Sequence, residues 1–314
     1  MASLISDVWK RTTVPNWKSL QTGLTVGDGS PPGPSTILYG AFPGDDGTGQ
    51  TKTQMRARTC ASFGVATLPV ERIYNLGVFT APPATGNHMV SFSFDPAQVA
   101  SGVYDTQFEN YVAALGSTRK FWLALNHEPE GDYPPANQIA GSRRFCDIVH
   151  ANSGPNIKTA TILMSSTLIG STTNWLQWYP GDTYIDCIGW DAYYRPKTLR
   201  TPQAVYGAAF DAAASRGKPT IIGETGIGAV GHGGHLENPV GSGIYTDIDD
   251  SVYNTFVTDT VAYLNAKPPG AMEAICWFNV VKSDGNWTFD CQGYNHLTSR
   301  AIWAAAVQNS VQYA

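Results

Sequence analysis

Charged residues are scarce in this sequence. Asp, Glu, Lys and Arg make up 14% of its 314 residues, whereas about 25% is usual for soluble domains. The Lys and Arg residues form no cluster and the net charge is −5, so we expect no nucleic-acid partner, because such binding needs concentrated positive charge. No apolar run approaches the roughly 20 residues that cross a bilayer, so we expect no membrane insertion.

A Sec signal peptide is also missing. The N-terminus reads MASLISDVWKRTTVPNW, without the charged head and continuous apolar stretch of such a signal. The chain is therefore cytoplasmic, exported by another route, or processed from a form that had a signal.

Cysteine is sparse and gives no recognisable framework. The five cysteines are an odd number and form no CxxC pair, which argues against a zinc site or a full set of disulfides. Cys146, Cys187 and Cys276 lie in apolar runs and are interpreted as buried free thiols. A single disulfide between Cys276 and Cys291 is the alternative.

Residues 1–35 differ in composition from the rest of the chain. They end in GDGSPPGPS, a Gly/Pro-rich stretch that is incompatible with a helix or a central strand. We predict an N-terminal arm that packs through Trp9 and Trp17 on a domain formed by residues 36–314. A linker to another module is the alternative.

From residue 36 onward, apolar runs alternate with helical patterns. The runs are continuous rather than alternating, as is typical of parallel strands buried on both faces. Eight such runs with helices between them predict one α/β domain, a (β/α)₈ TIM barrel. The predicted strands are residues 36–43, 68–75, 89–94, 121–127, 157–164, 185–194, 220–223 and 274–279, and the predicted helices are 108–115, 135–151, 202–216, 251–265 and 297–308.

Two of the runs end abruptly in a glutamate. FWLALNHEPEG places Glu128 after the fourth run, and PTIIGETG places Glu224 after the seventh. Barrel active sites lie at the C-terminal ends of the strands, so both carboxylates, with Asn126 and His127, are expected at the barrel mouth. A carboxylate pair there can cleave glycosidic bonds. Helix capping or a structural ion pair is the alternative for each glutamate, and Glu130 is an alternative acid.

This arrangement resembles the large clan of retaining (β/α)₈ glycoside hydrolases, which have an acid/base glutamate after strand four and a nucleophilic glutamate after strand seven. A histidine directly before the first glutamate is similar to glycoside hydrolase family 26, which includes β-mannanases. The stretch WYPGDTYIDCIGWDAYY, residues 178–194, also resembles that family's strand-six signature. The resemblance covers roughly residues 36–308. It departs at Thr225, where family members often have phenylalanine.

The resemblance implies a role for each matching residue. Glu128 would be the general acid/base and Glu224 the nucleophile. His127 would contact the substrate or hold the surroundings of Glu224. Tyr193 would donate a hydrogen bond to Glu224, and Arg72 would pair with Glu224 and keep it ionised.

Further residues are assigned to substrate binding. By the resemblance, Trp277 would form the floor under the sugar at the cleavage point. Asp191 binds a hydroxyl group or braces a loop. Trp175 and Trp178 stack on sugars at outer subsites, where aromatic faces meet pyranose C–H groups, or belong to the core.

We therefore predict a retaining, endo-acting glycoside hydrolase with a polysaccharide or oligosaccharide as its partner. One alternative is a phage-type depolymerase of a bacterial surface or cell-wall glycan, which the missing Sec signal favours. The other is a catalytically inactive carbohydrate-binding barrel. Action outside the cell or on a virion is expected, by a monomer unless the chain is part of a larger particle.

No cofactor and no metal are expected. His232 and His235 form an HxxH pair in a Gly-rich segment, but that segment offers no helix and no clear third ligand for zinc. We expect this segment to be a substrate-binding or lid loop.

Overall fold

The computed structural model describes residues 36–44, 49–168, 174–194, 201–227, 250–282, 285–286, 290–291, 294–295 and 297–311. The expected N-terminal arm, residues 1–35, and the HxxH pair at His232 and His235 lie outside the described residues.

Eight parallel strands close into a barrel in which neighbours follow chain order and β8 pairs with β1. This confirms the predicted (β/α)₈ fold, and each predicted strand overlaps an observed one. The seventh strand continues through Glu224 instead of ending before it. The strands are β1 (Leu38–Pro43), β2 (Val70–Leu76), β3 (Asn87–Ser93), β4 (Phe121–Leu125), β5 (Ile157–Met164), β6 (Cys187–Tyr194), β7 (Thr220–Ile227) and β8 (Met272–Asn279).

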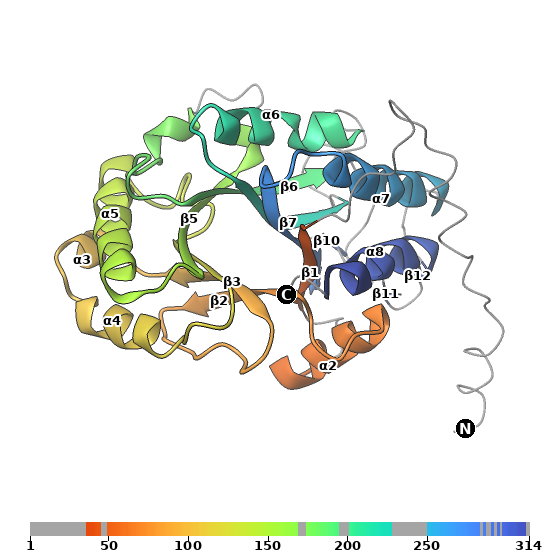
Figure 1. Cartoon of the computed structure of the whole chain (residues 1–314), viewed down its shortest axis with the longest axis horizontal. Helices are drawn as coiled ribbons and strands as arrows, with labels where there is room; N and C mark the ends of the chain where they lie inside the picture. Colours follow the sequence, from red (N-terminus) through yellow and green to blue (C-terminus); the bar gives the residue numbers. More distant parts are fainter. Residues whose placement is uncertain are drawn as a thin grey trace. The chain divides into compact units, whose positions relative to one another are not determined.

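Helices surround the barrel, as Figure 1 shows. They cover the outer faces of strands whose inner faces fill the barrel, which explains the continuous apolar runs. The helices are α2 (Lys52–Phe63), α3 (Pro96–Ala100), α4 (Asp105–Ala113), α5 (Pro135–Asn152), α6 (Pro202–Ala214), α7 (Asp250–Asn265) and α8 (Leu297–Ser310), with 3₁₀ turns η3 (Ser165–Thr167) and η4 (Trp175–Gln177) after β5.

Helix α2 was not predicted, because its sequence KTQMRARTCASF has few apolar residues. Its start is fixed by a capping box, in which the Thr51 side chain accepts from the Gln54 backbone and the Gln54 side chain accepts from the Thr51 backbone. It ends at Gly64, whose φ of 66° suits glycine. Arg56 on this helix forms a two-pronged ion pair with Glu71 of β2, which ties the helix to the barrel.

The core has two layers, because successive side chains of a barrel strand point inward and outward alternately. The larger layer lies between the strands and the helices. The inner layer fills the barrel and consists of Leu38, Val70, Met89, Trp122, Ala124, Ala160, Ile162, Cys187, Ile221, Ala274 and Cys276.

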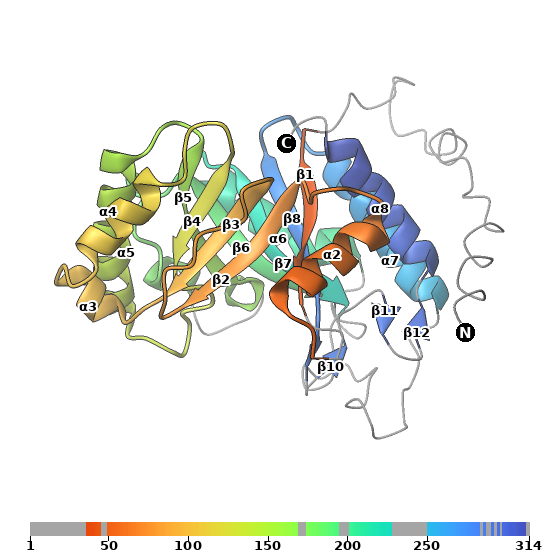
Figure 2. The same ribbon diagram turned by 90° about the horizontal axis from the view of Figure 1, so that it is seen from below.

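Two short antiparallel pairs follow β8 and were not predicted: β9 (Val281–Lys282) with β10 (Gly285–Asn286), and β11 (Asp290–Cys291) with β12 (Tyr294–Asn295). Since β9 begins two residues after β8 ends, it lies at the C-terminal end of the barrel, where Figure 2 shows β10. Strands of two residues are too short to leave a periodic signal in the sequence.

The four cysteines whose side chains the structure describes are buried thiols. Cys146, Cys187 and Cys276 are buried and free, as predicted, and so is Cys60. The alternative disulfide between Cys276 and Cys291 is therefore wrong, because Cys276 faces the inner core of the barrel.

Among the described residues, no helix combines the length and the apolar character that a membrane crossing requires.

Candidate active site

A bulge in β7 places Glu224 at the barrel mouth. In the pairing of β6 with β7, Trp190 lies opposite Ile222 but Asp191 lies opposite Glu224, so Gly223 is an extra residue on β7. A Cβ atom at position 223 would lie 2.7 Å from Oδ1 of Asp191. Glycine is therefore required where β7 brings Glu224 beside Asp191. The Glu224 side chain is buried.

Two tyrosines hold the Glu224 carboxylate. The hydroxyl of Tyr193, on β6, donates to Oε2, and the hydroxyl of Tyr74, on β2, donates to Oε1. Burial raises the pKa of both tyrosines well above its ordinary value, so both hydroxyls keep their protons and remain donors. Sequence reasoning named Tyr193 but missed Tyr74. Tyr74 is two residues after Arg72 and therefore lies on the same face of β2. This spacing was the signal in the sequence that could have placed Tyr74 at the site.

Arg72 supports this site without touching Glu224. Its Nη2 donates to Oγ of Ser91 at 2.8 Å, and its guanidinium lies 4.3 Å from the centre of the Tyr74 ring. The predicted direct pairing of Arg72 with Glu224 is therefore wrong, because Tyr74 occupies the contact with Oε1. Burial disfavours the Arg72 charge, but Tyr74, Asp191 and Glu224 raise the pKa of Arg72. It remains a buried cation beneath the carboxylates.

The loop after β4 that carries Glu128 has a strained backbone. Asn126 and Glu128 have φ values of 58° and 47°, a region that residues other than glycine rarely occupy and that often marks functional sites. Asn126 is buried and its side chain faces away from the mouth. It accepts from the Phe94 backbone N–H at 3.2 Å and donates to Gln138 Oε1 at 2.9 Å. Asn126 thus holds the loop.

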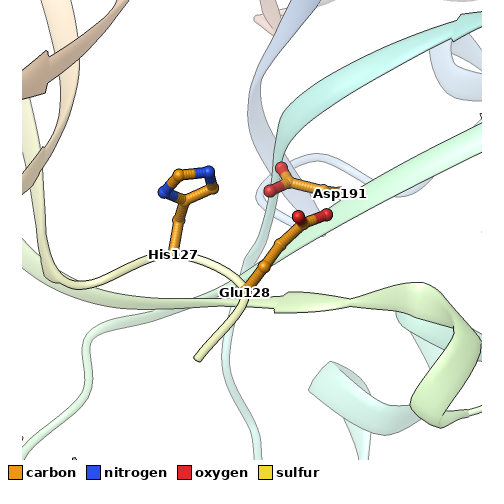
Figure 3. A group of neighbouring side chains, drawn as sticks. All are labelled: His127, Glu128 and Asp191. Carbon is orange, nitrogen blue, oxygen red and sulfur yellow. The ribbon is translucent and has the colours of Figure 1, made fainter. Parts of the chain in front are cut away.

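His127 and Glu128 converge on Asp191 of β6 (Figure 3). One ligand-type atom from each of the three side chains lies within 4.8 Å of the others. His127 also faces Glu224, with Nε2 3.9 Å from Oε1, and its ring centre lies 4.8 Å from that of Tyr74. The loop after β4 therefore joins the carboxylates of β6 and β7 in one cluster.

Asp191 has unusual surroundings for a carboxyl group. Its side chain is buried, and neither carboxyl oxygen has a hydrogen-bond partner. The predicted loop-bracing role therefore has no hydrogen bond to support it. Burial, and then the negative charges of Glu224 and Glu128, raise the pKa of Asp191 well above its ordinary range, although Arg72 acts in the opposite direction. These surroundings thus disfavour a negative charge on Asp191.

Glu130, the alternative acid, is bound to the neighbouring strand. Its Oε1 accepts from the backbone N–H of Met164, the last residue of β5, at 3.0 Å. Burial raises the pKa of Glu130 to about 7. This contact gives Glu130 a bracing role between the β4 loop and β5.

Trp277 does not form a floor for the sugar, contrary to the prediction. It is fully buried, and its ring centre lies 5.1 Å from that of Trp303 on α8. Cys276 faces the inside of the barrel, so alternation turns Trp277 outward. Phe278 points inward instead and is buried; it is stacked on the half-buried Phe42, with 5.4 Å between ring centres, and lies near the half-buried Tyr193. Both phenylalanines were missed.

Trp175 and Trp178 belong to the core rather than to outer sugar subsites. Their side chains are buried in the layer between strands and helices. The Trp175 ring centre lies 5.1 Å from that of Tyr179 and 5.6 Å from that of Trp190. Of the two predicted alternatives, stacking on sugars and a place in the core, the structure shows the core for both residues.

Comparisons with known proteins agree with the (β/α)₈ fold. An endo-β-1,4-mannanase of glycoside hydrolase family 26 from Cellulomonas fimi has a similar structure over 88% of this chain and 73% of its own, with a TM-score of 0.58 and 14% identity. A family 26 β-mannanase from Bacteroides ovatus matches 87% of this chain and 89% of its own, with a TM-score of 0.51 and 14% identity. The resemblance to family 26 mannanases is confirmed for the fold.

Other glycan hydrolases share this fold. An endo-β-1,3-glucanase of family 128 from Amycolatopsis mediterranei, determined with laminaripentaose, matches 87% of this chain and 100% of its own, with a TM-score of 0.53 and 14% identity. In sequence, Endoglucanase H of Acetivibrio thermocellus is 30% identical over 146 residues. That match covers 41% of this chain but only 16% of the length of the curated relative. No family profile matches the sequence.

Proposed function

We propose that this protein is a retaining glycoside hydrolase that cleaves a β-linked polysaccharide within the chain, with Glu224 as nucleophile and Glu128 as acid/base. The observation that carries the proposal is the environment of Glu224. Each of its carboxylate oxygens accepts a hydrogen bond from a tyrosine on a different strand. Such a carboxylate is fixed in one orientation at the barrel mouth, which suits attack on a single carbon atom.

The surroundings divide the two roles between the glutamates. Glu224 has two hydroxyl donors, with Arg72 as a buried cation behind Tyr74, and these hold the carboxylate in place for attack. Glu128 stands on a loop rather than in a strand, is only half-buried, and lies near Asp191. A negative Glu224 nearby favours a proton on the second glutamate.

The reaction follows from these positions. Glu128 donates its proton to the oxygen of the leaving sugar while Glu224 attacks the anomeric carbon, which breaks the glycosidic bond and forms a covalent glycosyl ester on Glu224. Glu128, now ionised, takes a proton from water. That water attacks the same carbon, releases Glu224, and leaves the product with the original anomeric configuration.

The chemistry of the mouth supports a neutral sugar chain as the substrate. Phe42, Phe278 and Tyr193 form an aromatic cluster beside Glu224, and aromatic faces pack well on the C–H faces of pyranoses. The similar structures include hydrolases named for β-1,4-mannan and β-1,3-glucan. We therefore place mannan and β-glucans first among the candidate substrates.

The test is hydrolysis of a panel containing mannan, galactan, xylan, β-1,3- and β-1,4-glucans and bacterial surface glycans. The anomeric form of the first product is read by proton NMR. We expect a β-product and complete loss of hydrolysis in Glu224→Ala, with glycan binding kept. An activated 2-fluoro sugar should add one glycosyl mass to the wild type and none to Glu224→Ala.

The matched control is Glu109→Gln, an exposed carboxylate of α4, which should keep full activity. An α-product from a β-linked substrate would overturn the retaining mechanism. Hydrolysis that persists in Glu224→Ala would remove the nucleophile assignment, and binding without hydrolysis by the wild type across the panel would favour an inactive carbohydrate-binding barrel.

A further inference from the structure

His127, Glu128 and Asp191 present the donor set of a metal site at the barrel mouth. One imidazole nitrogen and two carboxylate oxygens lie within 4.8 Å of one another, and Figure 3 shows the three side chains converging from the β4 loop and β6. Imidazole nitrogens and carboxylate oxygens both bind zinc, and zinc sites with three protein ligands keep a fourth position for water. The proposed hydrolysis needs no metal, so this set calls for a separate explanation.

Asp191 gives an independent indication that the cluster can hold a cation. The exposed fraction of Asp191 is 3%, both of its carboxyl oxygens are buried without a hydrogen-bond partner, and it points toward the other two side chains. Buried oxygens without partners are costly. A divalent cation would bond to these oxygens, in a cluster that also contains the carboxylates of Glu128 and Glu224.

We propose that these three residues bind one Zn²⁺ ion and that bound zinc inhibits the enzyme. Zinc bonds of about 2.1 Å in a tetrahedral site place ligand atoms roughly 3.4 Å apart. Since the ligand atoms lie within 4.8 Å of one another, the cluster must contract by at most about 1.4 Å. Glu128 and His127 are only half-buried and stand on a loop, which lets their side chains make that movement toward the buried Asp191.

The inhibitory effect rests on the proposed function, whereas zinc binding does not. A Glu128 carboxylate that is bonded to zinc cannot hold the proton that the leaving sugar requires. A zinc-bound His127 is also drawn away from Glu224, whose Oε1 lies 3.9 Å from its Nε2. Zinc and substrate should therefore exclude each other, and inhibition should be reversed by a chelator.

Zinc binding is measured by titration calorimetry on the metal-free full chain with ZnCl₂ at one fixed pH. The wild type should bind one strong equivalent, and Asp191→Asn should weaken that binding at least tenfold. Glu128→Gln is a second variant with the same expected loss, in case Asp191→Asn does not fold, as checked by circular dichroism. His150→Gln is the control. His150 on α5 pairs with Asp186, the residue directly before β6, at 3.1 Å. The variant therefore removes a histidine–aspartate pair that is not part of the proposed zinc site, and zinc affinity should not change.

The outcomes separate the possible sources of binding. Equal zinc affinity in the wild type and both site variants would overturn the proposal, and so would binding lost only in a His232→Ala/His235→Ala double variant. A strong equivalent that does not slow hydrolysis would overturn the inhibitory part. If the wild type binds zinc at this site but hydrolyses no glycan, the proposed function fails while the metal site stands.

Discussion

The hydroxyl of Tyr74 donates a hydrogen bond to Oε1 of Glu224, from β2 to β7 across the barrel mouth. Tyr193 donates to the other oxygen, so the carboxylate is held from two sides. The two tyrosines differ in what else they touch. Arg72 lies over the Tyr74 ring, and Phe278 lies near Tyr193. Replacing each hydroxyl therefore tests the carboxylate contact while the ring packing is kept.

Tyr74→Phe and Tyr193→Phe should each lower kcat by roughly 10²-fold, the usual cost of removing one donor from a charged catalytic group. The phenylalanine ring preserves the packing, so the melting temperature should change little. Tyr104→Phe is the matched control, since its hydroxyl binds exposed Gln98 at 2.7 Å. Unchanged kcat in both site variants would contradict the role given to the Glu224 contacts.

The free energy of unfolding of Asp191→Asn should exceed that of the wild type by an amount that grows as the pH rises. The pKa of Asp191 is raised in the folded state by burial and then by Glu224 and Glu128. The folded state therefore holds this proton more tightly than the unfolded chain, and wild-type stability falls as the pH rises above the unfolded value of about 4. Asparagine carries no such titration. Urea unfolding at several pH values between 4 and 8 should show a widening difference, and a constant difference would contradict the assignment.

Glu130→Gln should stabilise the protein at pH 8 but not at pH 4. The folded-state pKa of Glu130 is about 7, raised by burial, so the wild type loses stability as the pH rises from about 4 through 7. Glutamine keeps the oxygen that accepts from Met164. We expect a gain on the order of 1–2 kcal/mol at pH 8, after allowing for partial exposure. Urea unfolding measures it, and the exposed Glu109→Gln should show no such change. Hydrolysis lost completely in Glu130→Gln would instead restore Glu130 as the acid.

Trp277→Phe separates a packing role from substrate contact. Trp277 packs on Trp303 and is fully buried, so the variant should lose roughly 1–3 kcal/mol of stability through the cavity it leaves. Its KM should stay at the wild-type value. Phe42→Ala, which removes the half-buried ring stacked on Phe278, should raise KM instead. A raised KM in Trp277→Phe would show that the ring reaches the substrate.

Trp277 also shows where sequence reasoning reached its limit. The order of strands was readable because a run such as FWLAL is apolar throughout. Because such a strand is apolar on both faces, the sequence does not show which side chains point into the barrel and which point toward the helices. Nothing in CWFN shows whether Trp277 or Phe278 points inward, and an aromatic residue suits both places.

The candidate site was predictable where polar residues interrupt an apolar strand end. Glu128 and Glu224 were found in this way, since a charge after a buried run has few structural explanations. Tyr74 was missed because tyrosine is common in strands, although Arg72 two residues earlier marked its face. The bulge at Gly223, which sets Glu224 beside Asp191, depends on pairing between strands, and the sequence of one strand does not record it.

Glu273 should be important for stability and not for activity. It lies at the opposite end of the barrel from the site, because it is the second residue of β8. Its Oε2 accepts from Nε1 of Trp122 at 2.7 Å and from the Cys187 thiol at 3.4 Å, and its Oε1 accepts from Nζ of Lys158. Trp122 and Lys158 are also the second residues of their strands, β4 and β5, so this cluster closes the inner core at the N-terminal end.

Glu273→Ala should therefore lower the free energy of unfolding by about 2 kcal/mol, because it leaves the indole N–H and the Lys158 amine without their acceptor. Glu273→Gln keeps an acceptor for Trp122 but removes the charge opposite Lys158, so its loss should be smaller. Urea unfolding gives both values, and kcat measured well below the melting temperature should equal that of the wild type. A kcat that falls with Glu273→Ala while the protein stays folded would mean that the two ends of the barrel are coupled, since the Glu273 contacts involve no residue of the mouth.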